Sequence, residues 1–271
     1  MTLPYAEVIG DPIAHSKSPA IHRFWLGKLG LSADYRACHV TAADLAGYLA
    51  ARRRDPLWRG CNVTVPHKLA ALALADRCDG AAEAIGAANL LVSAPDGALE
   101  ASNTDAAGFL EPIADLPLAS RHAAVIGAGG ASRAVLAALA GREIGLVTIL
   151  NRSPEKAVAL LARFGLAGEA VPLGVLLAPS CALLVNASSL GMAGQPPLEV
   201  DLAPLPGDAI VYDIVYAPLE TGLLAAARAR GLRTVDGLAM LIGQAAVAFE
   251  RFFGQPPRRE HDAELRSVLT S

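Results

Sequence analysis

The chain has 271 residues, of which 53% are hydrophobic and 18% charged, and its formal net charge is −3. This length allows two modest domains. The balance of charge argues against nucleic-acid binding, because the only basic run is the arginine triplet at 52–54, which ends a predicted helix where cations are favourable. A membrane protein is also excluded, since no apolar segment approaches the ~20 residues that span a bilayer.

The cysteine pattern indicates a reducing compartment. Cys38, Cys61, Cys78 and Cys181 have neither the spacing of a zinc site nor a CxxC motif. We therefore expect reduced cysteines in the protein core, no bound metal and a cytoplasmic protein. The N-terminus leads directly into a predicted strand over 5–10 and has no signal-peptide pattern.

The first hundred residues alternate strand and helix patterns. We predict strands over 5–10, 35–40 and 58–65 and helices over 19–29, 42–53 and 66–75. Thr41 precedes the second helix and is a suitable cap. Three polar clusters interrupt these elements at places where packing alone does not require polar residues.

The first cluster is His15-Ser16-Lys17-Ser18-Pro19. Ser18 followed by Pro19 favours a helix start, so capping explains Ser18. It does not explain Ser16. Hydroxyls at i and i+2 of an extended segment project to the same side and would suit a small polar ligand.

The second cluster runs from Asn62 to Lys68. Asn62 and Thr64 share one face of the strand end, and Pro66 stops the strand and starts a helix. Lys68 then lies in the first helical turn, the unfavourable end of the helix dipole for a cation. A solvated lysine tolerates this position. A catalytic lysine would use it, because a positive potential favours release of its proton.

The third cluster is Ser102-Asn103-Thr104-Asp105, directly before a predicted helix over 106–113. A carboxylate at a helix start is normally a cap. A fold that brings Asp105 beside Lys68 would instead form a charge-paired acid/base couple. Asn89 is a further candidate, although an ordinary turn also explains it.

The second half contains a glycine-rich turn, Gly127-Ala128-Gly129-Gly130-Ala131-Ser132-Arg133, between a strand over 123–126 and a helix over 134–140. Such turns hold a dinucleotide pyrophosphate against the helix N-terminus. The motif is degenerate, because Ser132 occupies its third small position. A tight strand-to-helix turn without a ligand is the alternative interpretation.

The strand over 146–150 ends in Asn151-Arg152-Ser153, where NAD-binding proteins usually have Asp or Glu. Arginine suits the 2′-phosphate of NADP, since its planar fork grips phosphate in a bidentate way. Alternatively, Arg152 is a solvated residue before a helix that Ser153 caps and Pro154 begins. Lys156 would add charge to the phosphate site or simply lie on the helix surface.

Apolar runs over 182–185 and 209–215 favour strands buried on both faces of a parallel sheet. Asn186 and Ser188 follow the first run and either line a cofactor crevice or serve as turn residues. A final helix is predicted over 237–253. It carries Gln244 within an apolar stripe, where the amide needs a hydrogen-bond partner such as a ligand hydroxyl.

The chain resembles the shikimate dehydrogenase family over essentially its full length. The resemblance rests on nine segments in order: GDPIAHSKSPAIH, NVTVPHK, GAANLL, SNTDAAGF, VIGAGGASRA, LNRSPEKA, NASSLGM, DIVYAPLET and DGLAMLIGQA. It implies an α/β fold of two domains. An α/β substrate domain would comprise 1–104 and 238–271, with the C-terminal helices packing back on it. A Rossmann-like, doubly wound NADP-binding domain would comprise 105–237.

The resemblance implies NADP-dependent, reversible reduction of 3-dehydroshikimate to shikimate, in aromatic amino acid (chorismate) biosynthesis. Lys68 would be the catalytic acid/base, with Asp105 as its partner. Both would also contact the substrate, whose carboxylate and hydroxyls would be held by Ser16, Ser18, Thr64, Asn89, Tyr216 and Gln244. The expected cofactor-binding residues are Gly127, Ala128, Gly129, Gly130, Ala131, Asn151, Arg152, Ser153, Lys156, Ile214 and Gly237.

Three other functions stay open at this point. Arg152 and Ser18 argue against an NAD-dependent quinate/shikimate dehydrogenase, and the Lys68–Asp105 couple argues against a non-catalytic, regulatory NADP-binding protein. A dehydrogenase for another cyclic hydroxy acid is consistent with the same residues. The sequence is equally consistent with a monomer and a homodimer.

Overall fold

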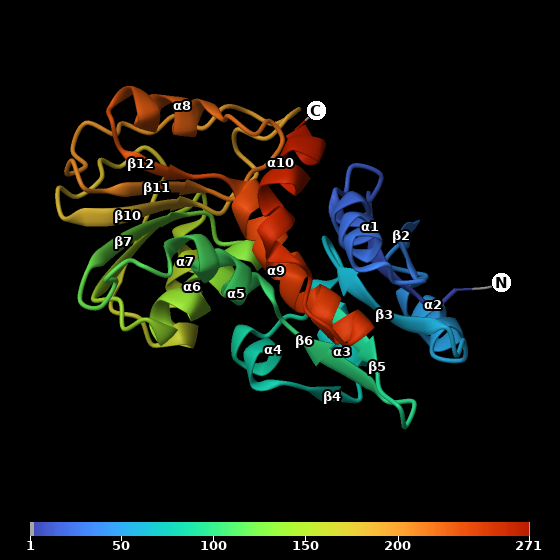
Figure 1. The fold of residues 1–271 in the computed structure, drawn as a ribbon. Coiled ribbons are helices and arrows are strands. Elements are labelled where there is room, and N and C mark those ends of the chain that lie inside the picture. Colours follow the sequence, from blue (N-terminus) through green and yellow to red (C-terminus); the bar gives the residue numbers. More distant parts are fainter. Residues whose placement is uncertain (1–2, 271) are drawn as a thin grey trace. The chain divides into compact units, whose positions relative to one another are not determined.

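The computed structural model describes residues 3–270, which form two compact units (Figure 1). Unit 1 takes in the chain up to Asp105 and from Ile242 onward, and unit 2 spans Ala106–Leu241. The boundaries expected from the sequence, after 104 and after 237, lie within a few residues of these. The second boundary falls inside helix α9 (Gly237–Phe253), which begins in unit 2 and ends in unit 1.

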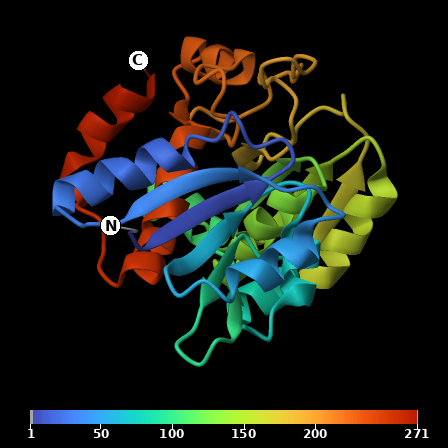
Figure 2. The same cartoon turned by 90° about the vertical axis from the view of Figure 1, so that its right-hand side faces the viewer.

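Unit 1 is built on a mixed six-stranded sheet with the order β2-β1-β3-β5-β6-β4. Strands β2, β1 and β3 are parallel, β5 runs antiparallel to β3 and β6, and β1 and β2 lie side by side in Figure 2. The strands are β1 (Tyr5–Gly10), β2 (Asp34–His39), β3 (Trp58–Val63), β4 (Arg77–Cys78), β5 (Leu90–Ser93) and β6 (Leu99–Ser102). The helices are α1 (Ser18–Leu29), α2 (Leu45–Arg52), α3 (Lys68–Leu74), α4 (Gly80–Ile85), α10 (Asp262–Thr270) and the 3₁₀ turn Arg259–His261.

The C-terminal segment completes unit 1, as the sequence predicts. Ala248 and Phe252 of α9 pack with Ala6 and Val8 of β1 in one buried apolar cluster. Helix α10 lies beside α1 (Figure 2), and an ion pair between Lys28 and Glu264 joins the two helices. The N-terminal strands therefore depend for part of their core on residues near the other end of the chain.

Every residue of β1 is buried, including the charged Glu7. Arg52 donates to both carboxylate oxygens of Glu7, at 2.9 and 3.0 Å, and Tyr48 donates at 2.6 Å. A buried carboxylate is tolerated only with such partners. Arg52 thus has a specific ion-pair partner in the fold, beyond the general preference for cations at a helix end.

Unit 2 is built on a six-stranded, entirely parallel sheet with the order β12-β11-β10-β7-β8-β9. Read from β9, this is the 3-2-1-4-5-6 order of dinucleotide-binding folds, whose ligands bind where the order reverses, here between β7 and β10. The strands are β7 (His122–Ile126), β8 (Leu146–Leu150), β9 (Gly168–Val171), β10 (Cys181–Asn186), β11 (Ile210–Asp213) and β12 (Arg233–Val235). The helices are α6 (Gly130–Gly141), α7 (Pro154–Phe164), α8 (Gly222–Ala229) and α5 (Asp105–Leu110), which is followed by the 3₁₀ turn Glu111–Ile113.

Apolar clusters cover both faces of this sheet, with Val125 and Ile149 in one cluster and Ala124 and Leu184 in the other. The alternation follows from the period of two along a strand. The predicted α/β fold with a doubly wound, Rossmann-like unit is confirmed. None of the described helices is long and apolar enough to cross a membrane.

One capping prediction is wrong and a second holds only for the position of the residue. Helix α2 starts at Leu45 after Asp44, and the Thr41 hydroxyl donates to the Asp44 carboxylate at 2.6 Å instead of capping the helix. Ser153 is the N-cap residue of α7 and Pro154 begins the helix, as expected, but the Ser153 side chain makes no capping hydrogen bond. Neither hydroxyl therefore bonds to a backbone amide of the helix that it was expected to cap, and residue type alone does not reveal this.

The cysteine prediction is partly wrong. All four cysteines are free, and Cys61 and Cys181 are buried as expected. Cys38 is only partly buried, and Cys78 is exposed on β4, the short edge strand of its sheet. Among the described residues, no group of three or more His, Cys, Asp or Glu side chains could hold a metal ion.

Candidate active site and cofactor pocket

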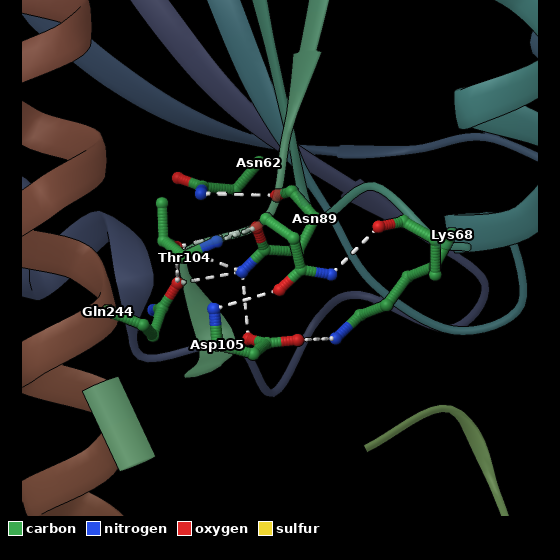
Figure 3. Close-up of polar contacts among 8 residues, drawn as sticks. Asn62, Lys68, Asn89, Thr104, Asp105 and Gln244 are labelled. Atoms are coloured by element: carbon green, nitrogen blue, oxygen red, sulfur yellow. Dashed lines mark hydrogen bonds and ion pairs between the residues drawn. The ribbon is translucent and has the colours of Figure 1, made fainter. Parts of the chain in front are cut away.

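Unit 1 brings Lys68 and Asp105 together, although they are 37 residues apart in the chain. Lys68 lies in the first turn of α3, as predicted, although the helix starts at Lys68 and not at Pro66. Its Nζ donates to Asp105 Oδ2 at 2.5 Å (Figure 3). Both side chains are largely buried, with exposures of 19% and 10%. A buried ion pair whose lysine faces the unfavourable end of a helix dipole is an unusual arrangement, and it suits proton transfer.

Asn89 fixes the other carboxylate oxygen. Its Nδ2 donates to Asp105 Oδ1 at 2.8 Å and lies 3.0 Å from Thr104 Oγ1, while its Oδ1 accepts from the Thr104 amide at 2.8 Å. Asn89 is only 3% exposed and directly precedes β5. The side chain is therefore a specific part of this cluster, beyond any role in a turn.

Gln244 of α9 reaches the same cluster. Its Oε1 lies 3.4 Å from Asn89 Nδ2 and 3.3 Å from Thr104 Oγ1 (Figure 3). The hydrogen-bond partners that the sequence required for this buried amide thus include protein groups. Residues from the start of α3, the end of β6 and α9 converge on one polar cluster.

Asp105 does not cap its own helix. Its backbone amide donates to Asn103 Oδ1 at 3.0 Å, and Asn103 is held in turn by the Ala87 carbonyl. Asn103 therefore bonds to the first amide of α5, which leaves the Asp105 carboxylate for Lys68 and Asn89. Asn103 and Thr104 belong to the polar cluster noted in the sequence, but nothing in the sequence distinguished their structural roles from that of Asp105.

Ser16 and Ser18 differ from their predicted geometry. The segment is not extended, because Lys17 has helical dihedral angles, and α1 begins at Ser18. The residue at the cap position is Lys17, not Ser18, and Ser16 Oγ accepts from the Ser18 amide at 3.3 Å. Lys17 Nζ donates to the Leu269 carbonyl at 2.6 Å and anchors this turn to the end of α10.

Thr64 directly follows β3 and is half-buried. Its methyl group fills the space beside Gly10, where a Cβ would lie 2.5 Å from Thr64 Cγ2. Asn62, within β3, donates to the Asn89 carbonyl and accepts from the Tyr35 hydroxyl at 2.6 Å. Asn62 therefore supports the turn that carries Asn89.

The glycine turn of unit 2 requires glycine at its first position. Gly127 has φ of +104°, and a Cβ there would lie 3.2 Å from the Ala187 carbonyl group. Ser132, the departure from the usual motif, is fully buried, and its Oγ accepts from the Gly129 amide at 3.2 Å. The serine therefore closes the first turn of α6 where a smaller residue would leave that amide unbonded.

A cavity of about 430 Å³ lies at this turn. It contacts Gly127, Ala128, Gly129, Asn151, Arg152, Ser153 and Lys156 from the predicted cofactor-binding set, and Ile126, Leu173, Ala187, Ser188, Ser189, Leu190, Gln195 and Pro196 in addition. Gly130 and Ala131 begin α6 next to it. Leu173, Gln195 and Pro196 come from loops that carry no sequence motif, so only the fold identifies them.

The cavity has a cationic edge. Arg152 and Lys156 are both exposed, and no Asp or Glu occurs among the described residues that line it. Asn151 holds the turn by donating to the Ser153 carbonyl at 2.9 Å. The charge and the glycine turn together suit a phosphorylated dinucleotide.

Asn186 does not line this cavity, although Ser188 does. Asn186 is fully buried at the end of β10, and its side chain bonds to Ser188, Leu190 and Asp213. Its side chain therefore belongs to the interior of the loop, so of the two predicted alternatives the turn role holds and the crevice role does not.

Tyr216, Ile214 and Gly237 belong to unit 2. Burial raises the pKa of Tyr216 above its ordinary value. Gly237 lies directly against Ile214, since a Cβ at 237 would be 2.1 Å from the Ile214 carbonyl oxygen. Only glycine allows this approach of α9 to the segment after β11.

The fold and the two sites define an α/β protein with a dinucleotide-binding unit and a second unit that carries a buried lysine–carboxylate pair. Three family models match: "Shikimate dehydrogenase substrate binding domain" over residues 8–91, "Shikimate / quinate 5-dehydrogenase" over 111–178 and "Shikimate 5'-dehydrogenase C-terminal domain" over 237–264. A curated relative, shikimate dehydrogenase (NADP(+)) of Sphingopyxis alaskensis, is 63% identical over 99% of this chain and 97% of its own length. The chain belongs to the shikimate dehydrogenase family.

Solved structures agree with this placement. Shikimate 5-dehydrogenase of Thermus thermophilus in complex with NADP(H) and shikimate is 39% identical, with a TM-score of 0.87 over 98% of this chain and 99% of that one. Ligand-free 5-ketofructose reductase of a Gluconobacter strain is 29% identical, with a TM-score of 0.91 over 99% of both chains. The same fold therefore also serves a reductase of another name.

Proposed function

We propose that this chain catalyses the NADP-dependent, reversible reduction of 3-dehydroshikimate to shikimate. The observation that carries the proposal is the 2.5 Å contact between Lys68 Nζ and Asp105 Oδ2, within a cluster that also contains Asn89 and Gln244. A protein that only binds a cofactor has no need of a buried proton-transfer pair. The family to which the chain belongs supplies the substrate class.

In the proposed reaction, Lys68 Nζ gives a proton to the oxygen of the ring ketone as it becomes an alkoxide. Bound NADPH supplies the hydride for the carbonyl carbon. Asp105 holds the lysine in place and, with Asn89 and Gln244, orients the substrate. Ser16, Ser18, Thr64 and Tyr216 bind the carboxylate and the remaining hydroxyls. General acid assistance of this kind is worth about 10²–10⁴ in rate.

The residues around the glycine turn suit NADP. Gly127 leaves room at a point where a Cβ would meet the Ala187 carbonyl, and Arg152 and Lys156 supply the cations for a 2′-phosphate. In this proposal Gly127, Ala128, Gly129, Gly130 and Ala131 hold the pyrophosphate, Asn151, Arg152, Ser153 and Lys156 the adenosine phosphate, and Ile214 and Gly237 the nicotinamide. Unit 1 is then the substrate domain and unit 2 the cofactor domain.

We also propose that the enzyme works in the cytoplasm, as its four free cysteines favour. Both a monomer and a homodimer suit the proposed function, because each candidate site is assembled from residues of one chain. Sedimentation at micromolar concentration distinguishes the two states.

Initial rates at the NADPH absorbance band test the function, with shikimate or quinate as substrate and NADP or NAD as cofactor. Fast oxidation of shikimate with NADP alone is expected. Faster turnover of quinate with NAD would make the chain a quinate dehydrogenase. One of the matching family models is named for both shikimate and quinate, which is why this alternative is tested. Tight NADPH binding without turnover in all four pairings would favour a regulatory protein or another hydroxy acid.

A further inference from the structure

A further buried carboxylate lies in unit 2, next to the loop that lines the cofactor pocket. Asp213 ends β11, is fully buried and forms no ion pair within the described residues. Three donors hold it: Asn186 Nδ2 at 2.9 Å and the Val215 amide at 3.0 Å on Oδ1, and the Thr221 hydroxyl at 2.7 Å on Oδ2. Burial raises the pKa of Asp213, and these three hydrogen bonds oppose that shift.

Asn186 connects Asp213 to the pocket wall. Its Nδ2 also donates to the Leu190 carbonyl at 3.0 Å, and its Oδ1 accepts from the Ser188 amide at 3.1 Å and the Ser188 hydroxyl at 2.7 Å. Ser188 and Leu190 line the cofactor cavity, whereas Asn186 and Asp213 do not. One buried amide therefore shapes the loop from its inner side.

Asp213, the Leu190 carbonyl and the Ser188 backbone amide together fix the direction of that side-chain amide. A primary amide has a donor end and an acceptor end of nearly equal size, and a flip of 180° exchanges them. A carboxylate only accepts, so Asp213 forces the donor end of Asn186 towards itself. The acceptor end is then left for Ser188, which fixes the hydroxyl that accepts from the Leu190 amide at 3.2 Å.

Asp213 also sets the direction of a second group. Thr221 donates its hydroxyl proton to Asp213, so a lone pair remains to accept from the Leu224 amide at 3.3 Å and cap α8. The start of α8 and the loop after β10 are thereby tied to one carboxylate. The partial positive charge of the α8 N-terminus further favours an anion at this position.

We propose that Asp213 is a positioning residue for NADP binding, which acts through Asn186 on the pocket wall formed by Ala187, Ser188, Ser189 and Leu190. The inference rests on the proposed function, because it takes the cavity at the glycine turn as the NADP site. Asp213 itself touches neither cofactor nor substrate in this proposal.

The test compares Asp213→Asn, Asn186→Asp and the double variant that exchanges the two residues. Asn186→Asp places two acceptors against each other and removes the donor to Leu190, so NADPH should bind about tenfold or more weakly, the cost of an unmade buried hydrogen bond. Asp213→Asn weakens the preference for one direction of the Asn186 amide and of the Thr221 hydroxyl, and a smaller loss of about threefold to tenfold is expected. In the double variant the introduced amide can donate to the introduced carboxylate, so NADPH should bind more tightly than to Asn186→Asp alone.

The readouts are the NADPH dissociation constant from fluorescence titration, the Michaelis constant for the ketone substrate and the thermal midpoint. Thr148→Val is the matched control, because it removes a buried hydroxyl that bonds His122 Nε2 at 3.0 Å in the same sheet, away from the pocket. The control should lower the midpoint and leave NADPH affinity unchanged. The Asp213 and Asn186 variants should weaken NADPH binding and leave the Michaelis constant for the ketone unchanged.

Each outcome has one meaning. If the wild-type chain does not bind NADPH, the proposed function fails before the inference is tested. If the wild type binds NADPH and the folded variants bind it equally well, Asp213 has no positioning role. The same conclusion follows if the losses of the two single variants simply add in the double variant, because coupling through one hydrogen bond requires non-additivity. If Asn186→Asp does not fold, the NADPH dissociation constants of Asp213→Asn and Thr148→Val are compared instead. Equal constants would mean that Asp213 has no positioning role.

Discussion

Asp105 shares its two carboxylate oxygens between Lys68, at 2.5 Å, and Asn89, at 2.8 Å. The three side chains come from the start of α3, the segment before β5 and the start of α5. The ammonium group therefore has a fixed direction in the folded protein. Placing a proton donor in this way before substrate binds lowers the cost of bringing it to the reacting atom.

Lys68→Ala should lower kcat by about 10²–10⁴, because it removes the proposed proton donor. NADPH binding should persist, since the cofactor pocket is lined by residues of unit 2. Steady-state rates and an NADPH fluorescence titration on the same sample measure both effects. Lys28→Ala, which removes a lysine on α1 that pairs with Glu264, is the control, and a near-normal kcat for Lys68→Ala would remove Lys68 from the mechanism.

Arg152→Asp should reduce the preference for NADP over NAD by about tenfold to a hundredfold, the worth of one or two charge-assisted hydrogen bonds to phosphate. The aspartate would also repel the 2′-phosphate and accept from a free ribose hydroxyl. The ratio of kcat/KM for the two cofactors checks this, with the exposed Arg54→Asp of unit 1 as control. An unchanged ratio would mean that Arg152 is simply a solvated residue before α7.

Gly127→Ala should impair cofactor binding, because alanine disfavours φ of +104° and its Cβ would press on Ala187. Strain of this kind costs about 1–3 kcal/mol. The expected results are a higher KM for NADP and a lower thermal midpoint. Gly141→Ala, at the end of α6 with open space around its Cβ position, is the matched control. Equal behaviour of the two variants would contradict a close approach at Gly127.

His22 should make the protein sensitive to acid. It is fully buried, and its ring stacks on that of Tyr35 with the ring centroids 3.9 Å apart. Neither ring nitrogen has a hydrogen-bond partner, and burial lowers the pKa of His22 to about 3. Because the unfolded chain binds the proton near pH 6.5, the stabilising contribution is complete above that pH and is lost as pH falls towards 3. The free energy of unfolding should decrease by about 1.4 kcal/mol per pH unit across this window.

His22→Phe keeps an aromatic ring against Tyr35 and removes the titrating group, so its unfolding free energy should fall less steeply from about pH 6.5 to about pH 4. Urea titrations at several pH values measure the slope. His15→Phe alters an exposed histidine and should retain the wild-type slope. Identical slopes in wild type and His22→Phe would contradict the assignment.

Strong local patterns allowed much of the fold to be predicted. The apolar run of β8 was located correctly and the start of α3 to within a few residues of Pro66, because strand periodicity and proline act over a short range. The pairing of Asp105 with Lys68 was expected as one possibility among others. The distance between Lys68 Nζ and Asp105 Oδ2 is known only from the three-dimensional structure, because neither sequence segment indicates how close the two side chains lie.

The failures share a cause. The capping roles of Thr41, Ser18 and Ser153 were assigned from residue type, but whether a hydroxyl meets a helix amide depends on dihedral angles that the whole loop determines. The crevice and the turn were both left open for Asn186, because residue type alone does not decide between them. Its actual partner, Asp213, is 27 residues away, and only the pairing of β10 with β11 brings them together.

Phe252 packs in the apolar cluster that covers β1, and this has a consequence for the folding of the chain during its synthesis. A ribosome that has released β1, β2 and β3 has not yet made the part of α9 that covers Ala6 and Val8. Unit 2 is one continuous stretch of the chain and can fold while translation continues, because domains generally fold as units during synthesis. The strands that are synthesised first therefore expose an apolar surface until α9 has been made. We expect chaperones to bind most strongly to nascent chains that are stalled before residue 242.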